Sequence, residues 1–196
     1  VPSKVYDQRL ELVERVSGLR DDQELEIGIG FETSDPFIRQ ICLNKGTDTR
    51  EFERAVEHVA SLPDNLCTRV SVVAYLLIKP PWLSDREAIE DAVNTLRYIA
   101  RLSQTTGVTI IPKLEPAIIS EGTLLSMLAR DGCYAPLNYW AVLEIVARCY
   151  FDDECSSLIP RMRIGTRGDM DESSKLPAVY KSCLLYTSDA ADEGVR

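Results

Sequence analysis

A continuous apolar run at residues 70–78 limits the folds open to this chain. The run reads Val-Ser-Val-Val-Ala-Tyr-Leu-Leu-Ile, and β-branched residues fill most of its first half. It is ended at once by Lys79-Pro80-Pro81. A short run of this kind is typical of a strand buried on both faces, which is the situation in a parallel sheet. The run is too short to cross a bilayer.

Three other segments are predicted to be strands. Residues 25–31 alternate between apolar and polar or small side chains, which is the periodicity of a strand. Residues 108–111 form a second short apolar run, which we expect to end at Pro112. A further strand is predicted near residues 158–164. Parallel strands require crossover connections, and the segments between these runs have helical periodicity.

Capping signals delimit two of the predicted helices. Asp48 with Glu51, and Ser84 with Glu87, have the spacing of a capping box. Gly107 is expected to end the second of these helices. Other helices are predicted at residues 4–19, 121–129 and 137–150. The alternation of strand and helix predicts the α/β class with a parallel sheet.

We expect residues 1–152 to form one unit and residues 153–182 to form a C-terminal extension. The run Cys183–Glu193 resembles the translation of a common sequencing adaptor, so residues 183–196 are interpreted as an artefact and left out of the fold. The chain begins with Val1 rather than methionine. We therefore expect it to be an N-terminally truncated fragment.

Composition excludes several classes of function. The formal net charge of −9 argues against a free-standing nucleic-acid binder, because such proteins need a basic surface. The chain has six cysteines but no C-x-x-C pair, which predicts no metal site. His58 is the single histidine, so a catalytic triad is not expected. Without a signal peptide, the cytoplasm is the expected location and no membrane is expected.

Charged residues follow the predicted strands, at the edge where parallel α/β folds bind ligands. Glu32, Lys79, Lys113 and Glu115 are the candidates. Each also has a plainer interpretation, in which Glu32 caps a turn and Lys79 solvates a strand end. Gly28 and Gly30 then only relieve crowding, and Trp82 and Trp140 are expected to pack.

The strand-end loops together resemble a known superfamily. Gly30-Phe31-Glu32-Thr33, then Ile38-Arg39 and Asn44-Lys45-Gly46, resembles the strand–loop–helix of radical S-adenosylmethionine (SAM) proteins. The nearer clade includes the Elongator catalytic subunit and the tRNA methylthiotransferases. Residues 75–82 and 134–144 are most similar to archaeosine synthase radical SAM subunits.

This resemblance implies part of a (β/α)6 partial TIM-type barrel with parallel strands. It also implies two cofactors, SAM and a 4Fe–4S cluster whose ligand cysteines precede Val1 and are absent from this chain. The fragment alone is then expected to be inactive. The resemblance assigns SAM binding to Glu32, Thr33, Lys45, Tyr75 and Lys79, with Lys45 near the methionine carboxylate. No catalytic residue is assigned.

The resemblance further implies a full-length enzyme that modifies a tRNA base, with tRNA and a transferase subunit as partners. Two alternatives remain open from the residues. One is a degenerate barrel that serves as a non-catalytic scaffold or binding subunit. The other is a TIM-type hydrolase that uses Glu32 and Glu115 as its acid–base pair.

Overall fold

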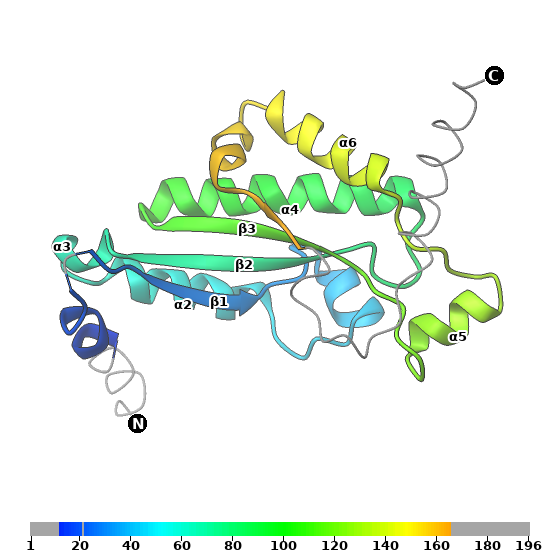
Figure 1. Cartoon of the computed structure of the whole chain (residues 1–196), viewed down its shortest axis with the longest axis horizontal. Coiled ribbons are helices and arrows are strands. Elements are labelled where there is room, and N and C mark those ends of the chain that lie inside the picture. The colour runs from blue at the N-terminus through cyan, green and yellow to red at the C-terminus, as the bar shows by residue number, and fades with distance from the viewer. Residues whose placement is uncertain (1–11, 21, 166–196) are drawn as a thin grey trace, which may run out of the picture.

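The computed structural model describes residues 12–20 and 22–165, and these residues contain a four-stranded sheet in the order β1-β2-β3-β4 (Figure 1). The strands are β1 (Leu25–Gly30), β2 (Val70–Ile78), β3 (Thr109–Pro116) and β4 (Arg163–Ile164). Every neighbouring pair is parallel. The predicted α/β class with parallel strands is confirmed, and the strands follow one another in chain order, as consecutive barrel strands do.

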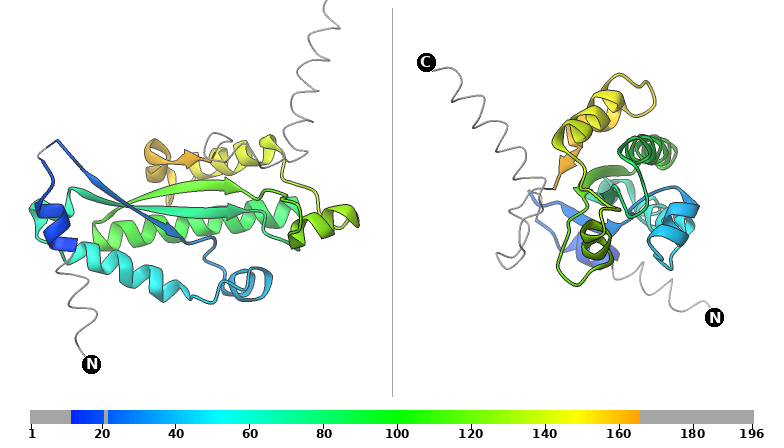
Figure 2. Two further views of the ribbon diagram at one scale, coloured as in Figure 1. Left: turned by 60° about the horizontal axis from the view of Figure 1, so that its bottom comes forward. Right: turned by 90° about the vertical axis from the view of Figure 1, so that its right-hand side faces the viewer.

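Helices connect the strands and cover one face of the sheet (Figure 2). α4 (Asp85–Thr106) connects β2 to β3 in the chain and runs along the sheet. α2 (Thr49–Ala60) lies beside it. The remaining helices are α3 (Asp64–Cys67), α5 (Leu124–Arg130), α6 (Tyr139–Tyr150), the π-helix η1 (Ile38–Cys42) and the 3-10 helix η2 (Ser156–Arg161). Residues 12–17 are also helical.

The cap residues read from the sequence are confirmed at both helices, and the reciprocal capping box is found at α4. The Asp48 side chain accepts a hydrogen bond from the Glu51 N–H at the start of α2. Ser84 and Glu87 form a reciprocal capping box at the start of α4. Gly107 ends α4 with a φ of 72°, in the left-handed region that glycine adopts without a steric penalty.

The core lies between the sheet and the helices. Val72, Ala74, Leu76 and Ile78 alternate along β2 and are buried in the same cluster as the inner faces of α2, α4 and α6. Phe31, just after β1, is fully buried and lies 4.3 Å from Phe52 between ring centroids. Truncating an aromatic side chain of this kind to alanine typically costs about 3–5 kcal/mol of stability.

The opposite face of the sheet carries the glycines and polar residues. Gly30 pairs in register with Tyr75, and Tyr75 pairs with Lys113. Neighbours in register share a face, and alternate residues of a strand share that face too. Gly28, Gly30, Tyr75, Lys113 and Glu115 therefore lie on one side of the sheet, away from the core residues of β2.

Two strand boundaries differ from the prediction. β3 continues through Pro112 to Pro116, because β4 pairs only with Lys113 and Leu114, so that Pro112 lies where β3 is an edge strand. Residues 156–161 form the 3-10 helix η2, and only Arg163–Ile164 is a strand. Pro160 within this stretch has no N–H for a strand ladder.

Some predictions fall outside the described residues. The helix predicted at residues 4–19 is seen only from residue 12, and the adaptor-like segment 183–196 lies entirely outside the described part of the chain. In residues 153–165, the segment beyond α6 contributes β4 to the sheet. Among the described residues, no helix combines the length and the apolar character needed to cross a membrane.

Candidate functional site

Glu32 follows β1 and has a backbone conformation that few side chains adopt. Its φ is 66°, in the left-handed region. The N–H groups of Phe31 and Glu32 both donate to the carbonyl of Tyr75, at 3.0 and 2.8 Å. The Glu32 carbonyl in turn accepts from the Leu77 N–H at 3.2 Å. Pairing with β2 therefore holds Glu32 in a conformation that non-glycine residues rarely adopt unless the surroundings enforce it.

The Glu32 side chain forms an ion pair with Lys45. Nζ of Lys45 lies 2.6 Å from Oε1 of Glu32, and the two side chains are 31% and 20% exposed. A Cβ at Gly30 would lie 2.8 Å from this Oε1 and 3.0 Å from this Nζ. Glycine at position 30 thus provides the space above the sheet that the ion pair occupies.

Arg39, in η1, contacts the backbone on both sides of Glu32. Its Nη1 donates to the carbonyls of Phe31 and Thr33, the latter at 3.0 Å. Its own carbonyl accepts from the Lys45 N–H at 3.1 Å, and its Nε donates to the Thr47 carbonyl at 2.8 Å. Burial lowers the pKa of this guanidinium, and the Glu32 carboxylate opposes the shift. Arg39 therefore connects the backbones that carry both members of the ion pair.

Thr33 is fully buried and fastens the same loop to α4. Its Oγ1 donates to Oδ1 of Asp91 at 2.6 Å and accepts from the Asp35 N–H at 3.0 Å. The next residue, Ser34, binds Thr95 of α4 through its N–H at 3.0 Å. Thr33 was predicted to bind SAM. The structure shows its side chain engaged inside the protein, so direct binding stays a prediction.

Asp91 is the titratable group that the sequence did not reveal. Desolvation by burial raises its pKa to about 6, the Thr33 hydroxyl lowers it, and the Asp35 carboxylate raises it further. Perturbed acids of this kind gather at functional sites more often than elsewhere. Asp91 is distant in sequence from Thr33, and its neighbours on α4 mix apolar residues such as Ala92 with polar ones such as Glu90, so no sequence motif marks it.

The face beside the ion pair carries Tyr75 and two charged residues of β3. Nζ of Lys113 lies 5.2 Å from the centroid of the Tyr75 ring and 3.0 Å from Oε1 of Glu115. A Cβ at Gly28 would lie 2.9 Å from the Tyr75 ring, so both glycines of β1 make room for side chains on this face. Glu32 and Glu115, the proposed hydrolase pair, are each ion-paired with a different lysine.

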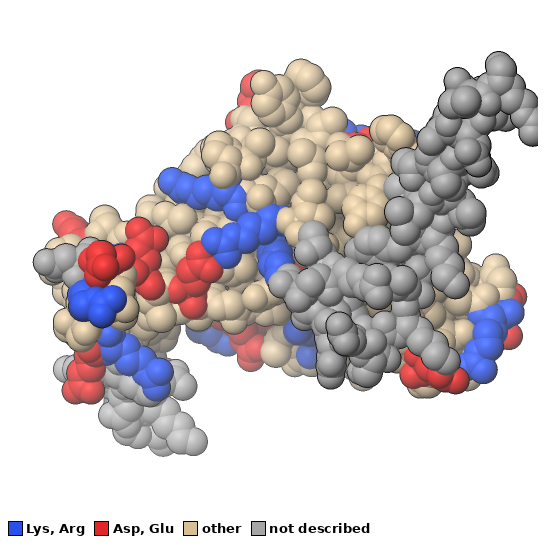
Figure 3. Space-filling view, viewed as in Figure 1, with Lys and Arg blue, Asp and Glu red and all other residues tan. Residues whose placement is uncertain are grey.

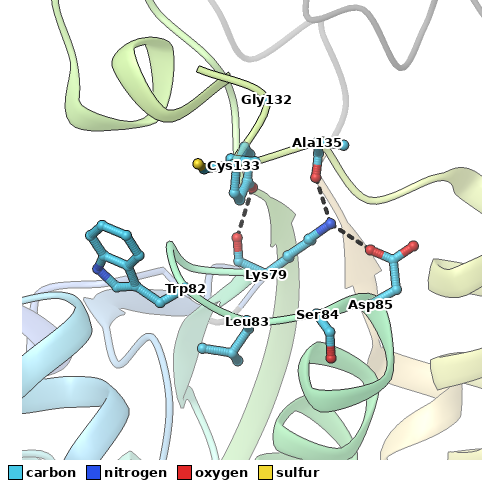
Figure 4. A pocket seen from close by; sticks show the side chains of 9 residues that line it. Lys79, Trp82, Leu83, Ser84, Asp85, Gly132, Cys133 and Ala135 are labelled. Atoms are coloured by element: carbon cyan, nitrogen blue, oxygen red, sulfur yellow. Dashed lines mark hydrogen bonds and ion pairs between the residues drawn. The ribbon is translucent and has the colours of Figure 1, made fainter. Parts of the chain in front are cut away.

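Lys79 lies in a separate pocket at the end of β2. Its side chain is 7% exposed, and Nζ contacts Oδ1 of Asp85 and the Ala135 carbonyl, each at 2.5 Å (Figure 4). Tyr134 donates its hydroxyl hydrogen to the Lys79 carbonyl at 2.8 Å. Figure 4 shows Nζ directed toward Asp85 and Ala135, on the side of the turn away from Trp82. The pocket volume is about 380 Å³.

The structure thus brings Glu32, Lys45 and the loop of Thr33 together, with Tyr75 and Lys113 on the adjoining face, and keeps Lys79 apart. The SAM-binding role of Lys79 stays a prediction. Trp82 and Trp140, expected to pack, are 60% and 77% exposed. Trp82 adopts a φ of 76° in the turn after Lys79 and lines the pocket of Lys79.

Both signs of charge occur on the face shown in Figure 3. Acidic and basic side chains are interspersed on the described part of the face in Figure 3. Arg163 of β4 and Glu26 of β1 are joined by two hydrogen bonds of 2.6 and 2.8 Å. Within the described residues, no group of three or more His, Cys, Asp and Glu side chains is placed to hold a metal ion.

Three of the described cysteines lie in or near α6 and the pocket of Lys79. Cys149 and Cys155 are fully buried, and Sγ of Cys149 donates to the Cys155 carbonyl at 3.0 Å. Burial raises the pKa of both thiols. Cys133 is exposed at the pocket near Lys79. A thiol with a raised pKa is a poor metal ligand, because the thiolate is the binding form.

Comparison with known proteins gives two relatives with the same name. The chain is 29% identical over 136 residues to archaeosine synthase subunit beta of Methanosarcina acetivorans, covering 69% of this chain and 36% of that protein. It is 29% identical over 140 residues to archaeosine synthase subunit beta of Thermococcus kodakarensis, covering 70% of this chain and 39% of that protein. The chain therefore spans less than two fifths of the length of these relatives.

Other comparisons add less. An uncharacterized protein of Methanocaldococcus jannaschii is 30% identical over 125 residues, covering 64% of this chain and 31% of that protein. A crystal structure of the IolI protein with a zinc atom matches with a TM-score of 0.43 and 16% identity, covering 83% of this chain and 48% of that chain. No family model matches the chain. The sequence relatives support a relation to archaeosine synthase.

Proposed function

We propose that this chain is part of a radical SAM enzyme that modifies a tRNA base. Two relatives are named archaeosine synthase subunit beta, which supports the part of the proposal that concerns archaeosine. The radical SAM part rests on the resemblance of the strand-end loops. The observation that carries the proposal is the Glu32–Lys45 ion pair, which lies just past β1 above a glycine. Ligands of parallel α/β folds bind at this edge of the sheet. The similarity to each of the two relatives covers more than two thirds of this chain.

The ion pair fits the polar part of SAM. The Lys45 ammonium can pair with a carboxylate, and the Glu32 carboxylate can accept hydrogen bonds from an ammonium group or from ribose hydroxyls. Because the pair is charge-balanced, it suits a ligand with both a carboxylate and an amine. Both side chains are partly exposed. Each can therefore release its partner and bind the ligand without prior unfolding of the loop.

The described residues do not provide a cysteine set for a 4Fe–4S cluster. Five cysteines are described, and within the described residues no three His, Cys, Asp or Glu side chains are grouped to hold a metal ion. In the proposal, the cluster would be held by cysteines outside this chain, where it would supply the electron that cleaves SAM. No step of that chemistry is assigned to the residues of this chain, whose proposed role is to bind and orient SAM.

The proposal includes tRNA and a partner subunit, both in the cytoplasm. The relatives are named as one subunit of a synthase, which supports an assembly of more than one chain. The net charge of −9 means that basic surfaces for phosphate contact would come from the rest of the complete protein or from the partner.

The test is SAM cleavage by the complete gene product. The protein is loaded anaerobically with iron and sulfide, reduced, and given SAM, and 5′-deoxyadenosine is measured by mass spectrometry. We expect product from the wild type and a loss of at least tenfold in Glu32→Gln at subsaturating SAM. Absence of both SAM binding and product in the wild type would reject the enzyme and favour a scaffold.

A further inference from the structure

We propose that Arg39 and Asp91 are positioning residues for the Glu32–Lys45 ion pair, and that they control ligand binding at the pair without touching the ligand. The inference rests on the proposed function for the identity of the ligand. Its structural basis is the set of hydrogen bonds that fixes the Glu32 loop from two sides.

The first side is Arg39. Its Nη1 binds the carbonyls that immediately precede and follow Glu32, those of Phe31 and Thr33. These two bonds fix both peptide planes that flank the left-handed Glu32 backbone. The carbonyl of Arg39 binds the Lys45 N–H. One residue, only 2% exposed, therefore sets the separation of the two backbones that the ion pair joins.

The planar guanidinium is required for this arrangement. Arg39 also donates from Nε to the Thr47 carbonyl and from Nη2 to Oγ1 of Thr47. Cζ of Arg39 lies 5.1 Å from the centroid of the Phe31 ring. A lysine ammonium has three donors at a single point and cannot reach carbonyls on both sides of the loop with the same geometry.

The second side is Asp91. The Thr33 hydroxyl accepts from the Asp35 N–H, so its own hydrogen is directed to the Asp91 carboxylate. Asp35 in turn accepts from the N–H groups of Phe37 and Ile38 at the start of η1, at 2.8 and 2.9 Å. A continuous path of hydrogen bonds thus runs from α4 through Thr33 and Asp35 to η1, which contains Arg39.

Asp91 gives this path a dependence on pH. The titratable groups around it are Asp35 in the loop and Cys42 in η1, and the pKa of Cys42 is raised by burial and by both carboxylates. Protonation of Asp91 replaces a charge-assisted hydrogen bond to Thr33 with a weaker neutral one. The loop is then held less firmly, and the ion pair loses its fixed geometry.

The test measures SAM affinity of the complete gene product by calorimetry for the wild type, Arg39→Lys, Asp91→Asn and a control, Arg97→Lys. Arg97 is matched to Arg39 because it also binds through more than one nitrogen, but its partners are Asp152 and Asn94. We expect the dissociation constant to rise at least tenfold in Arg39→Lys and to stay within twofold in Arg97→Lys. Thermal unfolding of each variant is recorded in parallel.

The pH profile separates positioning from simple destabilisation. We expect wild-type affinity to fall severalfold as the pH drops from 7.5 to 5, and Asp91→Asn to show the weakened affinity at both pH values. Unchanged affinity in Arg39→Lys, or an identical pH profile in Asp91→Asn, would overturn the inference while leaving the SAM site intact. Failure of the wild type to bind SAM would instead overturn the proposed function, and the inference with it.

Discussion

Nζ of Lys45 lies 2.6 Å from Oε1 of Glu32, directly above the backbone of Gly30. The two residues lie near opposite ends of the segment that connects β1 to α2. Gly30, the last residue of β1, has no side chain to fill the space that the pair occupies. The two side chains are 31% and 20% exposed, so the pair is partly buried. In the proposed function, the pair is placed for ligand binding.

Gly30→Ala should disturb binding and spare the fold. The added Cβ would lie 2.8 Å from Oε1 of Glu32 and 3.0 Å from Nζ of Lys45, which are the mobile ends of flexible side chains. We expect the free energy of unfolding in urea to change by less than about 1 kcal/mol, with SAM affinity of the complete gene product lowered about tenfold.

Gly107→Ala is the matched control for this substitution. Gly107 has a φ of 72° and no atom within 4 Å of a built Cβ, so alanine there is strained but touches nothing. We expect a loss of about 1 kcal/mol in stability and unchanged SAM affinity. If Gly30→Ala behaved like Gly107→Ala, the space above Gly30 would have no role in binding.

Asp91→Asn should stabilise the protein at neutral pH. The pKa of Asp91 in the folded protein is raised to about 6 from its ordinary 3.8, so the folded state binds its proton more tightly than the unfolded state. The resulting stabilisation of the wild type is complete below pH 3.8 and is lost as the pH rises through about 6. Asparagine can still accept from Thr33 and carries no buried charge.

The measurement is urea unfolding of wild type and Asp91→Asn across pH 4 to 8. With a discount for partial exposure, we expect the variant to be more stable by about 1–2 kcal/mol at pH 7.5 and nearly equal at pH 4. A difference between the two proteins that does not change with pH would show that Asp91 does not titrate in this range. A stabilising substitution that weakens binding is the trade-off expected at a functional site.

Lys79→Met tests whether Lys79 is a structural residue or a ligand-binding one. The substitution removes the partner of Asp85 and of the Ala135 carbonyl from a nearly buried position. We expect a loss of about 1–3 kcal/mol in the free energy of unfolding. Asp85→Asn serves as the control, because it weakens the same contact from its more exposed side. A drop in SAM affinity in Lys79→Met alone would support the role predicted for Lys79 from the sequence.

Cysteine reactivity should follow burial. Cys133 is exposed, whereas Cys149 and Cys155 are fully buried and have raised pKa values. The thiolate is the reactive form, so we expect iodoacetamide to modify Cys133 before Cys149 and Cys155, and to leave these two unmodified until the protein unfolds. Peptide mass spectrometry at timed intervals gives the order, and early labelling of Cys149 would contradict the packing of α6.

Periodicity and capping residues in the sequence predicted most of the helices and strands. β1, β2, α2 and α4 follow from periodicity and from the caps at Asp48 and Ser84, because these depend on neighbouring residues. The same patterns placed Glu32 at a strand end. They did not show that Glu32 adopts a left-handed φ, since that depends on pairing with Tyr75 and Leu77 of β2.

Contacts between residues far apart in the chain could not be predicted from the sequence. The partnership of Thr33 with Asp91 joins a loop to α4, and no spacing rule links them. Lys79 was predicted to face SAM because it follows a strand, but its own left-handed φ accompanies a side chain directed to Asp85 and Ala135. The polar face of the sheet became clear only from the register that aligns Gly30, Tyr75 and Lys113.

The most direct test of the SAM site is calorimetric titration of SAM into the complete gene product and its Glu32→Gln and Lys45→Met variants. Arg101→Met is the control, because Arg101 forms an ion pair with Glu154 in which both side chains are more than half exposed. We predict that each of the first two variants weakens binding at least tenfold while Arg101→Met binds like the wild type. Wild-type affinity in both Glu32→Gln and Lys45→Met would contradict the assignment of this ion pair to SAM binding.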